Sequence, residues 1–246
     1  MADALELTAL HRLWRSGLLL LVFALGAWAW ASGLLPTVVD LWDDIVYLGR
    51  QHIALVAVSG GLAVVVGIPV GVVLTRPRLR HHGDTVLQLL NIGATIPTLA
   101  VLALSMSVLG IGNLPAVFGL FVASLLPIVA NTLAGIRAVP RHLVEAANGM
   151  GMSGGQILLQ VELPNALFVV YAGIRTALAI NVGTAPLAFL IGGGGLGELI
   201  FTGIALNEFS RMLAGAIPTA LVAIFVDFVM GQLQLWTIPR GVNPLR

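Results

Sequence analysis

Long apolar runs alternate with short polar connections along this chain. Six runs are long enough to be helices that cross a membrane, and they cover residues of about 17–35, 52–75, 85–110, 114–136, 165–190 and 211–236. A helix needs about 20 apolar residues to cross the roughly 30 Å hydrocarbon layer of a bilayer. The pattern therefore predicts an all-α integral membrane protein with six transmembrane helices.

The composition agrees with this pattern and limits the possible functions. Mean hydropathy is +1.01, and 58% of the 246 residues are hydrophobic while 9% are charged. The spans leave no block for a soluble domain of even about 50 residues, so nucleotide-binding or solute-binding domains are expected on partner chains. Because the chain has no cysteine, disulfides and thiolate sites are excluded. The first run lacks a small-residue cleavage site and is expected to remain as a span.

Charges are distributed unevenly between the two sides of the predicted topology. One side holds most of the cationic residues, all of which are arginines: Arg12, Arg15, Arg76, Arg78, Arg80, Arg137, Arg141, Arg240 and Arg246. The other side holds Asp40, Asp43, Asp44, Glu198 and Glu208 against Arg50 and Arg211. The positive-inside rule then places both termini in the cytoplasm. The connection after Pro36 predicts a short helix at the outer surface, over about Asp40–Ile45.

The longest polar connection, residues 137–164, predicts two short helices joined by a turn. Pro140 suits a first helical position, and Gly149 and Gly151 suit the end of that helix. Ser153, with Gln156 three residues later, forms a capping-box pattern that starts a second helix. Such a pair turns apolar side chains toward the cytoplasm. It either packs on its own bundle or is covered by a partner protein, and we expect the partner.

The sequence from Glu145 to Pro164, EAANGMGMSGGQILLQVELP, resembles the EAA loop of permease subunits of ATP-binding cassette (ABC) importers. The positions that match are Glu145, Ala146, Ala147, Gly151, Leu163 and Pro164. The resemblance implies a type I ABC importer permease-like bundle with a cytoplasmic coupling helix, which seats in a groove of a separate ATPase. It implies that Glu145 is the charged contact to the ATPase, that Ala146 and Ala147 form a small docking surface, and that Gly151 forms the turn.

Shorter motifs over most of residues 50–205 are similar to the branch of these permeases that imports glycine betaine, choline or carnitine. They are Thr95-Ile96-Pro97, Gly110-Ile111-Gly112, Leu126-Pro127, Asn131-Thr132, Gly135-Ile136-Arg137, Gly173-Ile174-Arg175-Thr176 and Ile191–Gly197. The resemblance implies three parts: an N-terminal span and outer surface helix (1–50), a core permease domain (51–236) with the coupling loop at about 137–164, and a cytoplasmic tail (237–246).

The same resemblance implies the partners and the location of the chain. The partners would be a cytoplasmic ABC ATPase dimer carrying ATP and Mg, a second permease copy or paralogue, an extracytoplasmic substrate-binding protein and membrane lipid, with no nucleic acid. The chain itself would be a transport subunit without enzymatic activity or a cofactor of its own, multi-pass in the bacterial plasma (inner) membrane.

Two charges and several polar residues fall inside the predicted spans. Arg175 and Asp227 are expected to face the bundle interior or a wet cavity; they could pair, or Asp227 could be solvated near the cytoplasmic interface. The candidates for the translocation path are Asn91, Thr95, Asn131, Asn181 and Thr184. For each of these five, the alternative is a hydrogen bond between helices.

Other patterns carry little functional information. Gly192–Gly197 satisfies G-x-G-x-x-G, but it follows an apolar helix and not a strand, so we expect an outer loop or re-entrant turn instead of a dinucleotide site. His81 and His82 lack a further ligand for a metal, and no catalytic set of nucleophile, base and acid is evident. The rival functions are an importer for methionine or another small solute and, more distantly, a polytopic membrane enzyme or an ion-driven carrier.

Overall fold

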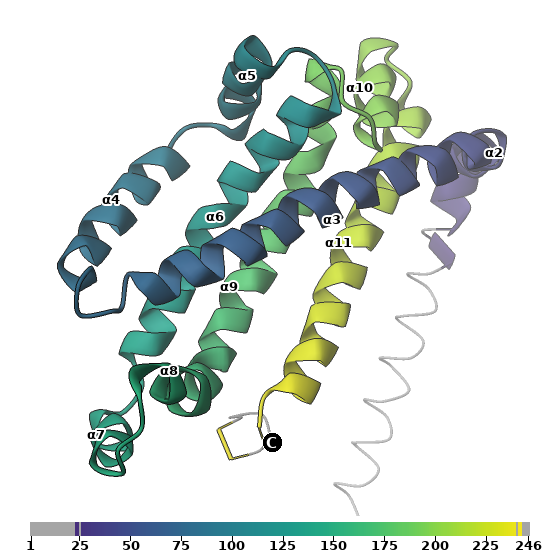
Figure 1. Ribbon diagram of the computed structural model, residues 1–246. Helices are drawn as coiled ribbons and strands as arrows, with labels where there is room; N and C mark the ends of the chain where they lie inside the picture. The colour runs from purple at the N-terminus through teal and green to yellow at the C-terminus, as the bar shows by residue number, and fades with distance from the viewer. Residues whose placement is uncertain (1–22, 25, 240, 243–246) are drawn as a thin grey trace, which may run out of the picture.

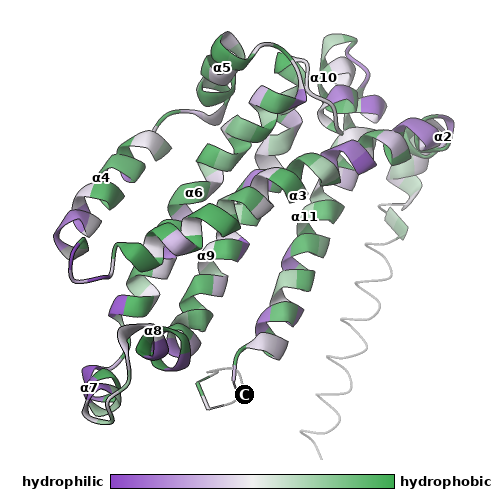
Figure 2. Ribbon diagram, viewed as in Figure 1, coloured by the Kyte–Doolittle hydropathy of each residue, from purple (hydrophilic) through white to green (hydrophobic). Residues whose placement is uncertain are grey.

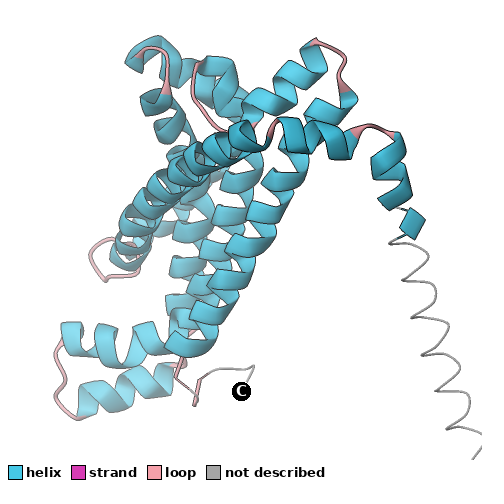
Figure 3. Cartoon of the chain, turned by 90° about the vertical axis from the view of Figure 1, so that its right-hand side faces the viewer, coloured by secondary structure: helices cyan, strands magenta, loops and turns pink. Residues whose placement is uncertain are grey.

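The computed structural model describes residues 23–24, 26–239 and 241–242, which fold as an all-α bundle (Figure 1). Loops and turns join the helices, and no strand occurs within the described residues (Figure 3). Residues 17–22 and 25 of the predicted first span lie outside these residues, as do Arg12, Arg15, Arg240 and Arg246.

Four long helices form the centre of the bundle. They are α3 (Trp42–Val73), α6 (Asn113–Arg137), α9 (Leu163–Thr184) and α11 (Phe209–Thr237). Helix α6 packs against both α3 and α9, and α11 packs against α9. Within the described residues, four segments are long and apolar enough to cross a membrane, or five if the bent pair α4 (Gly83–Ala94) and α5 (Thr98–Leu109) counts as one span.

The start of α3 differs from the sequence prediction. A short helix, α2, covers Leu34–Asp40, and α3 begins at Trp42, so Asp43, Asp44 and Ile45 belong to the spanning helix and not to a separate surface helix. The two aspartates occupy the first turn, where a negative charge stabilises the positive end of the helix dipole. With 32 residues, α3 is about 48 Å long and exceeds the hydrocarbon thickness.

The predicted third span, 85–110, is a broken helix. Helices α4 and α5 meet at an angle of 93°. Pro97 lies at the break, where it has no N–H to donate and disfavours helical geometry at Ile96. Pro69, Pro127 and Pro218, in contrast, lie inside α3, α6 and α11 without ending them.

Glycines allow the central helices to approach closely. A Cβ atom added at Gly71 of α3 would lie 2.6 Å from Thr132 Cβ of α6, and one added at Gly67 would lie 2.8 Å from Ile128 Cγ2. On α9, a Cβ at Gly173 would lie 2.7 Å from the carbonyl oxygen of Pro127. Only residues without a side chain fit at these three positions, so the backbones of α3, α6 and α9 lie close together.

Polar residues gather at the two ends of the bundle, while apolar residues cover its length (Figure 2). One end carries α7 (Arg141–Gly149) and α8 (Gly154–Ile157) beside the last turn of α6 and the first turn of α9. The opposite end carries α2, α5 and α10 (Gly197–Ala205), with η3 (Ala185–Ile191) leading to α10. Apolar side chains such as Val65 and Ile224 are 69% and 67% exposed, which suits contact with lipid or another membrane chain.

Candidate functional site

Residues 141–162, here called the hairpin, project from one end of the bundle and contain the two predicted short helices. The turn between them is at Gly151, whose φ of 78° lies in the left-handed region that favours glycine. Ser153 and Gln156 form a capping box, with the Gln156 side chain accepting from Ser153 N at 2.8 Å and Ser153 Oγ accepting from Gln156 N at 3.4 Å. The predicted helix, turn and capping box are thus confirmed.

The boundaries of the two hairpin helices differ slightly from the prediction. Pro140 is the N-cap of α7 and not its first helical residue. The second helix begins as α8, widens to a π-helix over Leu158–Glu162 (η2), and continues directly into α9. The widening precedes Pro164, which has no N–H to offer the preceding turn, a known cause of π-helical geometry.

The surface of the hairpin combines charged, small and apolar side chains. Glu145 and Ala146 are exposed, and Glu145 makes no ion pair with the rest of the described chain. Met150 and Leu159 are 75% and 65% exposed. Ala147, which the resemblance assigned to the docking surface, is 1% exposed, so it is part of the packing inside the hairpin and not of its outer surface.

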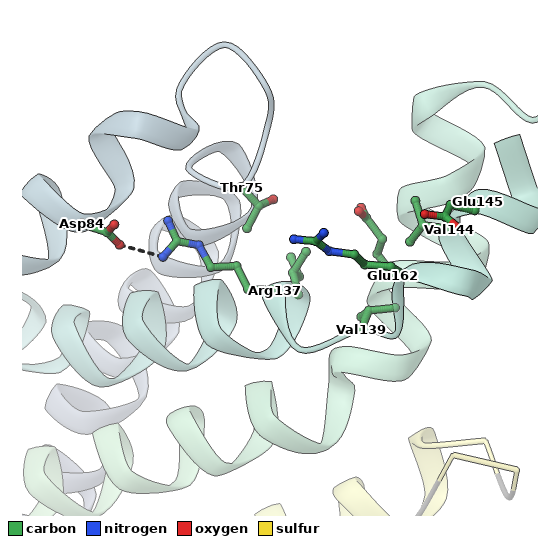
Figure 4. Close-up of a pocket in the computed structure, with 9 residues that line it drawn as sticks. Thr75, Asp84, Arg137, Val139, Val144, Glu145 and Glu162 are labelled. Carbon is green, nitrogen blue, oxygen red and sulfur yellow. Dashed lines mark hydrogen bonds and ion pairs between the residues drawn. The ribbon is translucent and has the colours of Figure 1, made fainter.

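Two ion pairs lie at the roots of the hairpin, one holding the hairpin to the bundle and one joining two bundle helices. At one root, Arg76 Nη2 lies 2.6 Å from Glu162 Oε2 and joins the end of α3 to the start of α9. At the other root, Arg137 Nη1 lies 2.7 Å from Asp84 Oδ1 and joins α6 to α4. Figure 4 shows this second pair on one side of a cavity and Glu145 on the other. The cavity has a volume of about 700 Å³.

Arg175 of α9 and Asp227 of α11, whose pairing was left open by the sequence, form a two-point ion pair. Arg175 Nε donates to Asp227 Oδ1 at 2.8 Å, and Arg175 Nη2 donates to Asp227 Oδ2 at 2.7 Å. Gln234, two helical turns beyond Asp227 on α11, accepts from Arg175 Nη1 at 3.4 Å. An isolated charge at mid-membrane costs about 2.5 to 3.5 kcal/mol on insertion scales, and pairing reduces this cost.

The five candidate path residues do not share one surface. Asn181 is fully buried between α3, α6 and α9, where its amide donates to Ser59 Oγ and Ser124 Oγ, both at 2.9 Å. Asn131 and Thr184 donate to carbonyl oxygens of their own helices. Asn91 and Thr95 are exposed beside the break between α4 and α5. Asn181 is thus an interhelical hydrogen-bonding residue in this structure.

We expect replacement of Asn181 by leucine to lower stability more than replacement of the exposed Asn91 by leucine. Loss of the amide removes its hydrogen bonds to the buried Ser59 and Ser124 hydroxyls, which then keep only the bonds to carbonyls of their own helices, and this costs about 1 to 2 kcal/mol. Thermal unfolding of the purified variants measures the difference. Equal shifts in Tm for Asn181→Leu and Asn91→Leu would contradict the role of Asn181 as an interhelical residue.

Comparison with known proteins assigns the chain to a family. Residues 63–237 match the family described as the binding-protein-dependent transport system inner membrane component. The chain belongs to this family. It is 51% identical to the osmoprotectant import permease protein OsmY of Salmonella typhimurium over 91% of this chain and 94% of that protein. It is 39% identical to the choline transport system permease protein OpuBB of Bacillus subtilis over 82% and 93% of the two chains.

A solved structure shares the fold. The inward-facing MetNI methionine ABC transporter contains a chain that matches with a TM-score of 0.68 and 25% identity, covering 81% of this chain and 96% of that one. The predicted resemblance to ABC importer permeases is therefore confirmed, and the chain is a permease subunit and not an enzyme.

A glycine-rich loop of the permease, residues 192–196, is anchored to two helices at the end opposite the hairpin. Gly195 N donates to Gln51 Oε1 of α3 at 3.1 Å, and Gly194 N donates to Asn113 Oδ1 of α6 at 3.0 Å. The loop follows the 3₁₀ segment η3 and precedes α10, so it lacks the strand that a dinucleotide-binding loop follows.

Sequence analysis missed four residues that organise the ends of the permease: Gln51, Asp84, Asn113 and Glu162. Gln51 lies inside an apolar helix, and its bond to residue 195 depends on a contact far along the chain. Glu162 directly precedes the Leu163-Pro164 motif, and Arg76 directly follows the second apolar run. Opposite charges at two span ends on the same side of the membrane were the only signal that could have suggested their pairing.

Proposed function

We propose that this chain is the membrane-spanning subunit of an ATP-driven importer for osmoprotectants such as glycine betaine, choline or carnitine. The observation that carries this proposal is the 51% identity to an osmoprotectant import permease over 91% of the chain. In this proposal the permease is inserted through six spans, the first of which precedes α2, with both termini and the hairpin in the cytoplasm. The parts are the N-terminal span with the outer residues (1–50), the core (51–236) and the tail (237–246).

The hairpin is the proposed contact with a cytoplasmic ABC ATPase dimer that binds ATP and Mg. Its exposed face supports this role because Glu145, Ala146 and Met150 offer a charge, a small residue and an apolar residue for docking. Gly151 supplies the turn, while Leu163 and Pro164 lead from the hairpin into α9. ATP binding would draw two hairpins together and switch the bundles between outward-facing and inward-facing states.

The proposed assembly has two permeases and one extracytoplasmic binding protein. The second permease is either a copy of this chain or a paralogue, since the chain resembles OsmY and is also 38% identical to the OsmW permease of the same organism. The binding protein would dock at the end that carries α2, the start of α3 and α10. Among the path candidates, Asn91, Thr95 and Thr184 keep a proposed role in the pathway, while Asn131 and Asn181 belong to helix packing.

Reconstitution of the full complex in proteoliposomes tests this function. The complex should accumulate labelled glycine betaine, choline or carnitine only when ATP is present on the hairpin side. Methionine is the second candidate solute, because the matching solved structure is a methionine transporter. ATP-dependent uptake of methionine, with none of the three osmoprotectants, would replace the proposed substrate class. Absence of ATP-dependent uptake for all four solutes would reject both.

A further inference from the structure

The Arg175–Asp227 pair lies half-exposed deep within the spans, on a surface shared by α9 and α11. Arg175 is twelve residues after Leu163, about 18 Å along the helix, and Asp227 is ten residues before Thr237, about 15 Å along α11. The two side chains are 36% and 50% exposed within the described protein. Since charged groups inside a membrane face protein or water instead of lipid tails, this surface borders protein or an aqueous space and not lipid.

The guanidinium of Arg175 is held in place yet keeps free donors. It has five N–H groups, of which Asp227 takes two and Gln234 takes one. One N–H on each of Nη1 and Nη2 is left without a partner among the described residues. Gln234 is 4% exposed, so the side chain that accepts from Arg175 Nη1 is itself held in place by packing. A fixed guanidinium with two unpaired donors is suited to bind a carboxylate.

Two adjoining cavities open on this pair. Their volumes are about 650 and 380 Å³, and both are lined by Arg175, Asp227 and Gln234. Phe228 lines the larger cavity and is 61% exposed, and Phe168 lines the smaller one. The space holds a carboxylate for a positive charge and, beside it, aromatic rings that attract quaternary ammonium groups.

The neighbouring face of α9 leaves room for a solute to move. Its exposed residues along one side are small: Ala172, Thr176, Ala179 and Gly183. A Cβ added at Gly231 of α11 would lie 4.0 Å from the Arg175 guanidinium, so this position also keeps the space above the charge pair open. The pair is therefore reachable along α9 as well as from the cavities.

We propose that the Arg175–Asp227 pair, with Phe228 and Phe168, is a solute site within the membrane that recognises a zwitterion carrying a carboxylate and a quaternary ammonium group. The carboxylate of the solute binds the free Arg175 donors, while its ammonium group lies against Asp227 and the rings. The net charge of the pair is zero, so it matches a neutral betaine or carnitine better than choline, which has no carboxylate. This inference rests on the proposed function and adds the residues that select among its solutes.

Maximal uptake rates of glycine betaine and choline by the complete reconstituted complex test the site. Saturating amounts of binding protein and solute remove the selectivity of the binding protein from the comparison. The Arg175→Gln variant should lower the ratio of betaine to choline uptake at least roughly tenfold. It removes the guanidinium that donates to the carboxylate of betaine, and it leaves Asp227 free to attract the choline cation. The exchanged variant Arg175→Asp/Asp227→Arg restores the pair and should restore most of the ratio.

Tyr171→Phe is the matched control. It removes the hydrogen bond that Thr237 donates to Tyr171, which also joins α11 to α9. Tyr171 does not line either cavity. This variant should keep the wild-type ratio of betaine to choline uptake. In all variants, the rate of ATP hydrolysis stimulated by loaded binding protein should stay at the wild-type level. If Arg175→Gln slows the uptake of both solutes by the same factor, the pair is only a link between helices and the inference is overturned. Failure of the wild-type complex to transport either solute would instead reject the proposed function.

Discussion

Glu145→Lys is expected to abolish ATP-driven uptake while the permease still folds and inserts. Glu145 is exposed on α7 and has no ionic partner in the described chain, so its replacement removes no interaction that stabilises the bundle. If Glu145 meets a cationic group in the ATPase groove, reversal of its charge costs about 3 kcal/mol, or roughly a hundredfold in ATPase affinity. Titration of the permease with purified ATPase measures the affinity, and proteoliposome uptake measures the consequence.

The control for Glu145→Lys is the same substitution at Glu198. Glu198 is exposed in the first turn of α10, at the end of the bundle opposite the hairpin. Glu198→Lys should leave ATPase affinity unchanged, because the two positions lie on opposite sides of the membrane in the proposed topology. Wild-type affinity of the Glu145→Lys variant for the ATPase would remove Glu145 from the docking surface.

Glu162→Arg is expected to uncouple ATP hydrolysis from transport. Glu162 is the carboxylate that holds the end of α3 at the root of the hairpin, through Arg76 at 2.6 Å. Its side chain is 14% exposed, so two arginines at this site would repel each other with little screening by water. A hairpin freed from α3 would still dock on the ATPase, but its movement would reach the bundle weakly. The amount of solute moved per ATP should fall at least roughly tenfold.

Charge exchange distinguishes coupling from simple loss of stability. The Arg76→Glu/Glu162→Arg variant restores an attractive pair in reversed order and should recover most of the transport per ATP. Glu208→Gln serves as the control, since it removes an exposed pair with Arg211 at the opposite end of the bundle. Unchanged transport per ATP in the Glu162→Arg variant would show that the movement of the hairpin reaches α3 without the Arg76–Glu162 contact.

Local signals in the sequence predicted the hairpin well. The Ser153 capping box and the Gly151 turn depend on residues within three positions of each other, so the sequence contains all the information they need. The central helices followed from the lengths of their apolar runs. The break at Pro97 was missed because five other prolines also lie in apolar runs, and three of them, Pro69, Pro127 and Pro218, are inside continuous helices. Tertiary packing decides which proline bends a membrane helix, and packing is not a local property.

The candidate site was harder to predict because polar residues inside membrane spans have two possible environments. Asn181 and Thr95 looked equivalent in the sequence, yet one is buried among three helices and the other is exposed at a helix break. The Arg175–Asp227 contact joins residues 52 positions apart, and only the arrangement of α9 and α11 brings them together. Their opposite sign allowed a pairing hypothesis but gave no geometry.

The unbroken course of α3 has a thermodynamic consequence. Helix α3 contacts the glycine-rich loop through Gln51, and Arg76, three residues after the end of α3, contacts the hairpin root. In the proposed transporter, any ligand that stabilises one position of this helix must favour the same position at its other end. Linkage is reciprocal. If a loaded binding protein raises the affinity of the ATPase for nucleotide, bound nucleotide must raise the affinity of the permease for the loaded binding protein by the same factor.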